Sequence, residues 1–184
     1  KTLIIKRDNT ADKLHFGHEV SLKIYDPQEI AGGQSRYQIA EQPVFSAKNA
    51  LLNDRRGDFV LLINGMPVIH VELKNSGIPV CQACHQIEKY AHEGVFSGLF
   101  SLVQIFVAMT PEETLYFANP GPDGKFNTDY YFHWADFNNE PTNEWNGLVK
   151  NFLSIPMAHQ MIGFYTVADN TDGTLKVMRS YRFY

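Results

Sequence analysis

Two short aliphatic runs joined by an Asn-Gly pair constrain the fold of this 184-residue chain more than any other segment. The runs cover 59–63 and 68–73 and consist mainly of β-branched and other aliphatic residues, which favour strands. Asn64-Gly65 between them is a strong signal for a tight turn, because both residues tolerate the left-handed backbone conformation. The segment therefore predicts a β-hairpin, and charged residues lie at its open end.

Three charged residues at that open end share one face of the sheet only in one register. Side chains alternate along a strand, so Glu72 and Lys74 point to the same side, away from the aliphatic face. Asp58 joins them only if it lies opposite Glu72. This pairing requires a three-residue loop, 64–66, with Gly65 in the left-handed conformation beside a bulge. A two-residue loop would put Asp58 on the other face.

Two carboxylates and an amine placed in this way can bind a divalent metal ion and activate a water molecule against a phosphodiester. Mg²⁺ takes oxygen ligands and keeps several waters, and Asp58, Glu72 and the backbone carbonyl of Leu73 can supply three such oxygens. Lys74 beside the metal can orient the attacking water or stabilise the transition state. The alternative interpretation is an edge strand whose charges only prevent aggregation.

The remainder of the chain mixes strand-like and helix-like segments. This mixture predicts an α/β or α+β fold with a central mixed sheet flanked by helices. We expect strands over 19–25, 101–109 and 114–119, with the last two paired; helices over 81–93, 144–154 and 157–165, with a break at Pro156; loops over 31–37 and 121–129; and a strand or packing segment over 130–137.

The hairpin carries a resemblance to a known family. The segment RRGDFVLLINGMPVIHVELKN is similar to the nuclease motif of the R (restriction and motor) subunit of type I restriction–modification enzymes, which has a PD-(D/E)xK-type nuclease domain. The resemblance is strongest over residues 55–120. The motif positions are Asp58, Asn64-Gly65, Pro67 and Glu72-Leu73-Lys74, and Gly57 stands where the family often has Pro.

A branch of the same superfamily adds Gln-x-x-x-Tyr on the following helix. Gln86 and Tyr90 fit this pattern and lie one helical turn apart, on one face. The resemblance implies that both brace the active site or contact the DNA backbone. A separate cluster, Lys48, Arg55 and Arg56, is the best candidate for a phosphate contact, with a solvated loop as the alternative.

The function implied by the resemblance is magnesium-dependent cleavage of double-stranded DNA. In the family, a specificity subunit reads the target, a methylase subunit completes the complex, and ATP-driven translocation brings DNA to the nuclease. We expect 1–184 to be a single nuclease domain cut from a longer chain whose motor follows residue 184, because no phosphate-binding loop occurs. ATP would therefore bind the full-length subunit. The alternative is a non-catalytic docking module of the same complex.

Charge and composition limit the ways in which this chain could hold DNA. The net charge is −4, with +1 over residues 1–90 and −5 over residues 91–184. A stand-alone DNA binder usually presents a basic face, so we expect other domains or subunits to hold the DNA. A membrane span is not expected, since the sequence lacks an apolar run of sufficient length. Two cysteines and no export signal predict a cytoplasmic location.

One competing motif lies on the expected helix 81–93. Cys81, Cys84 and His85 form a Cys-x-x-Cys-His signature, which is typical of c-type haem attachment. The strand-rich context and the overlap with the Gln-x-x-x-Tyr helix disfavour haem. A zinc site would need two more ligands, and the sequence has no second cysteine pair. The third interpretation, two reduced cysteines packed on a helix, fits the burial preference of cysteine.

Overall fold

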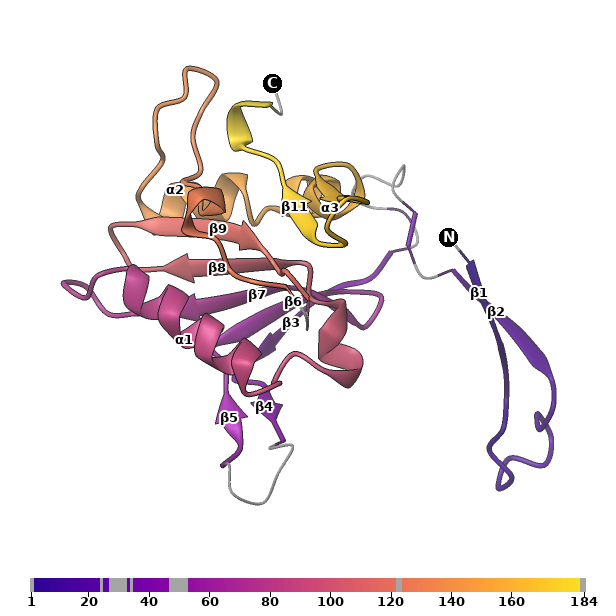
Figure 1. Ribbon diagram of the computed structural model, residues 1–184. Coiled ribbons are helices and arrows are strands. Elements are labelled where there is room, and N and C mark those ends of the chain that lie inside the picture. Colours follow the sequence, from indigo (N-terminus) through magenta and orange to yellow (C-terminus); the bar gives the residue numbers. More distant parts are fainter. Residues whose placement is uncertain are drawn as a thin grey trace.

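A five-stranded mixed sheet forms the centre of the computed structural model, which describes residues 2–23, 25–26, 33, 35–46, 53–121 and 124–182 (Figure 1). The β7–β8 pair is parallel, and the other three pairs are antiparallel. This arrangement confirms the expected α+β class with a mixed sheet. In spatial order the strands are β3 (Tyr37–Glu41), β6 (Phe59–Ile63), β7 (Met66–Leu73), β8 (Ile105–Met109) and β9 (Thr114–Ala118).

Helices cover both faces of this sheet. On one face the covering helix is the crossover connection that the parallel pair β7–β8 needs. That connection is α1 (Cys81–His92), which confirms the helix expected over 81–93 and packs on the face carrying Phe106 and Ala108. The opposite face packs against α2 (Trp145–Asn151) and α3 (Ile155–Gly163). The sheet is therefore the middle layer of three (Figure 1).

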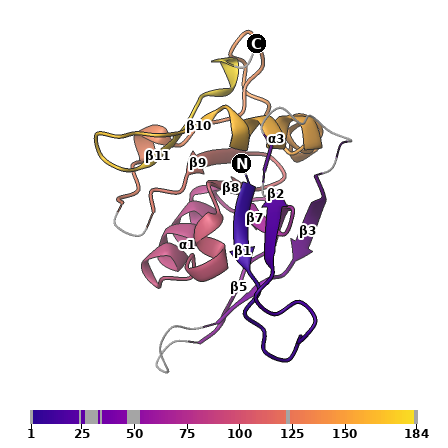
Figure 2. The same cartoon turned by 90° about the vertical axis from the view of Figure 1, so that its right-hand side faces the viewer.

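Smaller elements surround these layers. The hairpin of β1 (Thr2–Lys6) and β2 (Glu19–Lys23) stands beside the body of the molecule in Figure 1, and Figure 2 views the molecule from the side of this hairpin. No helix in the described part of the chain is long and apolar enough to cross a membrane. The other small elements are the short strands β4 (Val44–Phe45), β5 (Arg55–Arg56), β10 (Thr166–Ala168) and β11 (Leu175–Val177), and the 3-10 helices η1 (Gly98–Leu102), η2 (Thr128–Tyr130) and η3 (Ser180–Arg182).

The turn between β6 and β7 differs from the expected one. Asn64 and Gly65, at φ 53° and 80°, form a two-residue turn closed by the pair Ile63 and Met66. The three-residue loop expected over 64–66 is therefore wrong. Two consecutive left-handed residues make a turn whose twist matches the strands that it connects, which favours the shorter loop.

A bulge in β7 nevertheless restores the expected register. Leu62 lies opposite Pro67 and Leu61 opposite Ile69, so Val68 is an extra residue on β7. Beyond the bulge the ladder continues to the pair Phe59 and Val71. The next residues along the two chains are Asp58 and Glu72, which therefore meet at the end of this ladder. The expectation that a two-residue loop would separate them is wrong, because it did not allow for the bulge.

The face of β7 that carries Glu72, expected to lie away from the aliphatic face, is itself buried. The side chain of His70 is fully buried and that of Glu72 is 2% exposed. The reason is the position of β7, which lies third of five strands and is covered by helices on both faces. The Glu72 carboxylate is therefore set into the core, whereas Asp58 and Lys74 are only partly buried.

The outcomes for the other segments follow their local signals. The antiparallel pairing of β8 with β9 is confirmed, but the strand expected from residue 101 begins at Ile105, because η1 occupies 98–102. Pro156 lies in the first turn of α3 rather than between helices, a position where its missing N–H costs nothing. The aromatic segment 130–137 is a packing segment: Trp134 is buried, and Phe132 forms one bridge to Tyr116.

The turn geometry predicts a stability effect at Gly65. A Cβ added at this position meets no atom within 4 Å, so only the positive φ of 80° penalises a side chain. We expect Gly65→Ala to lower the free energy of unfolding by about 1 kcal/mol, measured by urea denaturation. Gly65→Asn should lose less, because Asn tolerates this conformation. Equal stability of Gly65→Ala and the unsubstituted chain would contradict the turn.

Candidate active site

The three charged residues of the hairpin meet at the carboxyl end of β7. Asp58 directly precedes β6, and its Oδ2 accepts a hydrogen bond of 2.6 Å from the backbone N–H of Leu73. Glu72 belongs to β7, and Lys74 follows the strand directly. The structure thus brings together the residues that the sequence singles out, through the register described above.

The Lys74 ammonium connects two of the expected metal-ligand oxygens. Its Nζ lies 3.4 Å from Oε1 of Glu72 and 3.1 Å from the backbone carbonyl oxygen of Leu73. The backbone N–H of Lys74 donates to the carbonyl of Met109, which ties this residue to β8. A single cation therefore already contacts both oxygens, which shows that they converge on one position.

Helix α1 supplies two further polar groups to the same position. The Gln86 side chain accepts from Nζ of Lys74 at 2.6 Å and donates through Nε2 to Oε1 of Glu72 and, at 2.7 Å, to the Tyr90 hydroxyl. The Tyr90 hydroxyl donates to the backbone carbonyl of Arg56 at 3.1 Å. Burial, and secondarily the Glu72 carboxylate, raise the pKa of Tyr90, which keeps its hydroxyl protonated as a donor. Contact of either residue with DNA stays a prediction.

His70 is a neighbour of Glu72 that the sequence did not single out. Its Nε2 lies 3.4 Å from Oε2 of Glu72, on the inner side of the carboxylate. The available signal was the alternation along β7, which puts residues 70 and 72 on the same face. The alternation did not reveal that His70 is buried, because predicting its burial requires knowing which helix covers this face.

The arginines expected to contact phosphate differ in their surroundings. Arg55 donates two hydrogen bonds to the Glu93 carboxylate, at 2.6 Å and 2.7 Å, which raise the pKa of Arg55 and lower that of Glu93. Arg56 is exposed, and its Nη1 lies 3.4 Å from Oε1 of Gln42. Lys48 lies outside the described residues. Phosphate contact stays a prediction, and the paired charge of Arg55 makes Arg56 the better candidate of the two.

The oxygen donors at the end of β7 fit the chemistry of Mg²⁺. Asp58 and Glu72 supply carboxylates and Leu73 supplies a carbonyl, and hard oxygen ligands are what this ion prefers. Mg²⁺ is commonly held by one or two carboxylates with several retained waters. The finding that the described residues contain no group of three or more His, Cys, Asp or Glu side chains suited to a metal is compatible with such a site.

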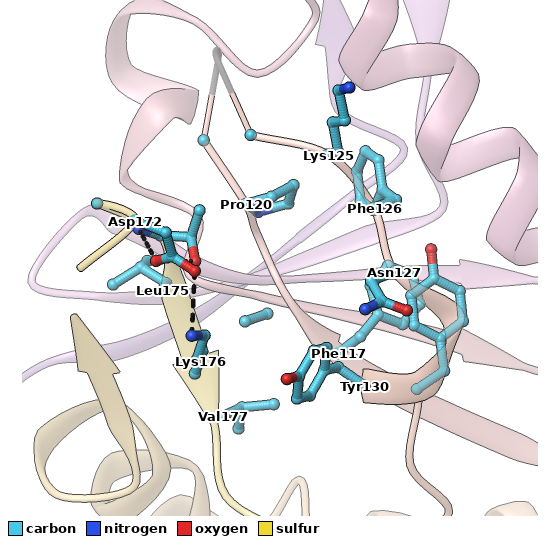
Figure 3. A pocket seen from close by; sticks show the side chains of 16 residues that line it. Phe117, Pro120, Lys125, Phe126, Asn127, Tyr130, Asp172, Leu175, Lys176 and Val177 are labelled. Carbon is cyan, nitrogen blue, oxygen red and sulfur yellow. Dashed lines mark hydrogen bonds and ion pairs between the residues drawn. The ribbon is translucent and has the colours of Figure 1, made fainter. Parts of the chain in front are cut away.

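A large hollow of the described part of the molecule lies elsewhere and contains none of these residues. This pocket of about 750 Å³ lies between β9, β11 and the segment 124–131, and aromatic side chains such as Phe117 and Tyr130 line it (Figure 3). Its Lys176 ammonium pairs with Asp169 and, at 3.1 Å, with Asp172. The pocket thus contains none of the residues that meet at the end of β7.

A comparison with known protein families decides the relationship of this chain. Residues 4–125 match the model of the family described as type I restriction enzyme R protein N terminus. The chain belongs to this family. The match includes all the residues at the end of β7 described above, together with the helix that carries Gln86 and Tyr90.

Similar proteins of the family include curated endonuclease subunits. The type I restriction enzyme SauCOLORF180P endonuclease subunit of Staphylococcus aureus (strain COL) is 33% identical over 129 residues, which are 70% of this chain and 14% of that protein. SsaAORF53P of Staphylococcus saprophyticus is 31% identical over 179 residues, 97% of this chain and 18% of the relative. The type I restriction enzyme EcoprrI endonuclease subunit of Escherichia coli is 32% identical over 129 residues, which are 69% of this chain and 41% of that protein. The chain thus spans less than half of each relative.

The cysteines of α1 lie in different environments, so only one of the two thiols is packed as expected. Cys81 is exposed, whereas Cys84 is buried against the sheet in the cluster that contains Phe106. Burial, with a smaller contribution from Glu88, raises the pKa of the Cys84 thiol to about 12. The thiol of Cys84 is therefore protonated and unreactive at neutral pH.

This difference predicts the reactivity of the two thiols. At pH 8 a disulfide reagent such as DTNB should modify one thiol of the folded chain quickly and both thiols in denaturant. Cys81→Ser should remove the fast reaction and leave the slow one. Rapid modification of both thiols in the folded chain would contradict the burial of Cys84.

Proposed function

We propose that this chain is the magnesium-dependent endonuclease domain of a type I restriction enzyme R subunit, with a PD-(D/E)xK-type fold. The observation that carries the proposal is the convergence at the end of β7. There the Lys74 ammonium bridges Glu72 and the carbonyl of Leu73, and Asp58 is fixed to the backbone of the same residue. Its substrate would be the phosphodiester bonds of double-stranded DNA.

Each residue of this group has a distinct role in the proposed reaction. Asp58, Glu72 and the Leu73 carbonyl would hold Mg²⁺, which when bound lowers the pKa of its water and offsets phosphate charge. The Lys74 side chain is 22% exposed, so its ammonium can reach both the buried carboxylate and a substrate at the surface. There it can orient a water or stabilise the charge that develops on the phosphate.

The helix residues keep these groups in place. Gln86 hydrogen bonds both Lys74 and Glu72, so that neither side chain can turn away without losing a partner. Tyr90 fixes Gln86 in turn and anchors it to the backbone of Arg56. Preorganisation of this kind lowers the cost of assembling the charged groups at the moment of reaction.

DNA would be held largely by other parts of the assembly. The net charge of −4 gives this chain little general attraction for a polyanion. We therefore propose that ATP-driven motor domains of the full-length subunit deliver the DNA, and that methylase and specificity subunits complete the complex. The relatives are named endonuclease subunits of type I restriction enzymes, which supports a place in an enzyme of several subunits.

The test is Lys74→Ala in the full-length protein assembled with its partner subunits. We expect DNA cleavage to fall by about 100-fold or more, because the substitution removes the only cation that contacts both Glu72 and Leu73 within the described residues. ATP hydrolysis, measured in the same reactions, should stay within about twofold of the unsubstituted enzyme, since the motor lies elsewhere.

Lys176→Ala is the matched control. Lys176 is also ion-paired, but with Asp169 and Asp172 at the distant pocket, so both activities should survive its removal. If Lys74→Ala cleaved DNA as fast as Lys176→Ala, the charged group would be structural. The chain would then be better interpreted as a docking module of the same complex.

A further inference from the structure

His70 lies in an unusual position for a polar side chain. It is fully buried, and the rings of Phe45, Phe96 and Phe106 surround it with centroids 5.9, 5.2 and 6.2 Å away. Neither ring nitrogen forms a hydrogen bond with any part of the chain that the structure describes. Buried polar groups of proteins are almost always paired, so this side chain requires an explanation.

The two nitrogens of His70 differ in what they face. Nε2 lies 3.4 Å from Oε2 of Glu72, and this oxygen is itself buried with no hydrogen bond among the described residues. Nδ1 faces Gly57, where an added Cβ would lie 3.4 Å away. A proton on Nε2 therefore has a carboxylate acceptor within a small movement, whereas Nδ1 has no hydrogen-bond partner among the described residues.

We propose that His70 is a positioning residue of this site, whose Nε2–H holds the inner oxygen of Glu72 and thereby presents the outer oxygen, Oε1, to the metal. The proposal rests on the proposed function. Oε1 is the oxygen that Lys74 and Gln86 contact. The two carboxylate oxygens thus have separate partners, one on the core side and one on the side of the reaction.

Gly57 makes room for this arrangement. A Cβ at residue 57 would lie 2.7 Å from Cε1 of His70, closer than real contacts allow, and 3.0 Å from Cε2 of Phe45, which is a tight contact. A ring at position 70 that reaches toward Glu72 therefore requires glycine at position 57. This contact also explains why the chain has no Pro there, although the resembling motif often does.

The test separates the hydrogen bond from the shape of the ring. His70→Phe keeps an aromatic ring among aromatic neighbours but removes the donor. His70→Gln keeps an amide N–H at about the reach of Nε2. The matched control is His159→Gln, at a second fully buried histidine, whose nitrogens lie 2.8 Å from the Tyr37 hydroxyl and from the Asp26 carbonyl on the opposite side of the sheet.

The first readout is independent of activity. In the ¹⁵N spectrum of the imidazole rings of the unsubstituted chain, His70 should carry its proton on Nε2, and Glu72→Gln should shift that signal. A proton on Nδ1, or a His70 signal that ignores Glu72→Gln, would overturn the proposal.

The second readout is the affinity for Mg²⁺ alone, obtained by following backbone amide signals, such as that of Leu73, during a titration of each variant. We expect His70→Phe to weaken binding by about tenfold to 100-fold, the range for residues that orient metal ligands. His70→Gln should recover most of that loss, and His159→Gln should bind as the unsubstituted chain does. Equal affinity of His70→Phe and the unsubstituted chain would overturn the role of His70 while leaving the nuclease proposal intact.

Failure of the nuclease proposal would be recognised from Mg²⁺ binding by the unsubstituted chain and by Glu72→Gln, rather than from the His70 variants. If the unsubstituted chain bound no Mg²⁺ at the end of β7, or if Glu72→Gln bound it unchanged, the metal site itself would be refuted and the role of His70 with it.

Discussion

The burial of the Glu72 carboxylate is the constraint on which the rest of the site depends. A carboxylate that is 2% exposed loses its hydration, and the loss is tolerable only if charged and polar partners replace the water. Lys74 and Gln86 supply these partners on one side and His70 faces it on the other. Helix α1 is therefore both a layer of the fold and half of the site, because it carries Gln86 into the core.

Local signals in the sequence were sufficient for much of this arrangement. Asn64-Gly65 predicted the hairpin, although not the length of its loop, since both residues tolerate the left-handed conformation. The lack of Gly and Pro over 81–93 predicted α1, and the four-residue spacing of Gln86 and Tyr90 placed both on one face of it. These predictions succeed because each depends on residues that are close together in the chain.

Features that depend on distant contacts could not be predicted. The bulge at Val68 was not predicted, although Pro67 beside it is a residue that inner strands accept mainly at bulges, and it reconciles a two-residue turn with Asp58 opposite Glu72. The burial of His70 follows from residues as far apart as Phe45 and Phe106, and the pairing of Arg55 with Glu93 joins residues 38 positions apart. The sequence did not predict β3, and of the β1–β2 hairpin it predicted only the second strand, because the strands that these segments pair with are distant in the chain.

The most direct test of this account is to locate a metal ion in the protein. Crystals of the chain soaked in Mn²⁺, a substitute for Mg²⁺ with a strong anomalous signal, should show a manganese peak coordinated by Asp58, Glu72 and the Leu73 carbonyl. A manganese peak bound only at other residues, or no peak at a saturating concentration, would contradict the claim that the end of β7 is a metal-dependent catalytic centre.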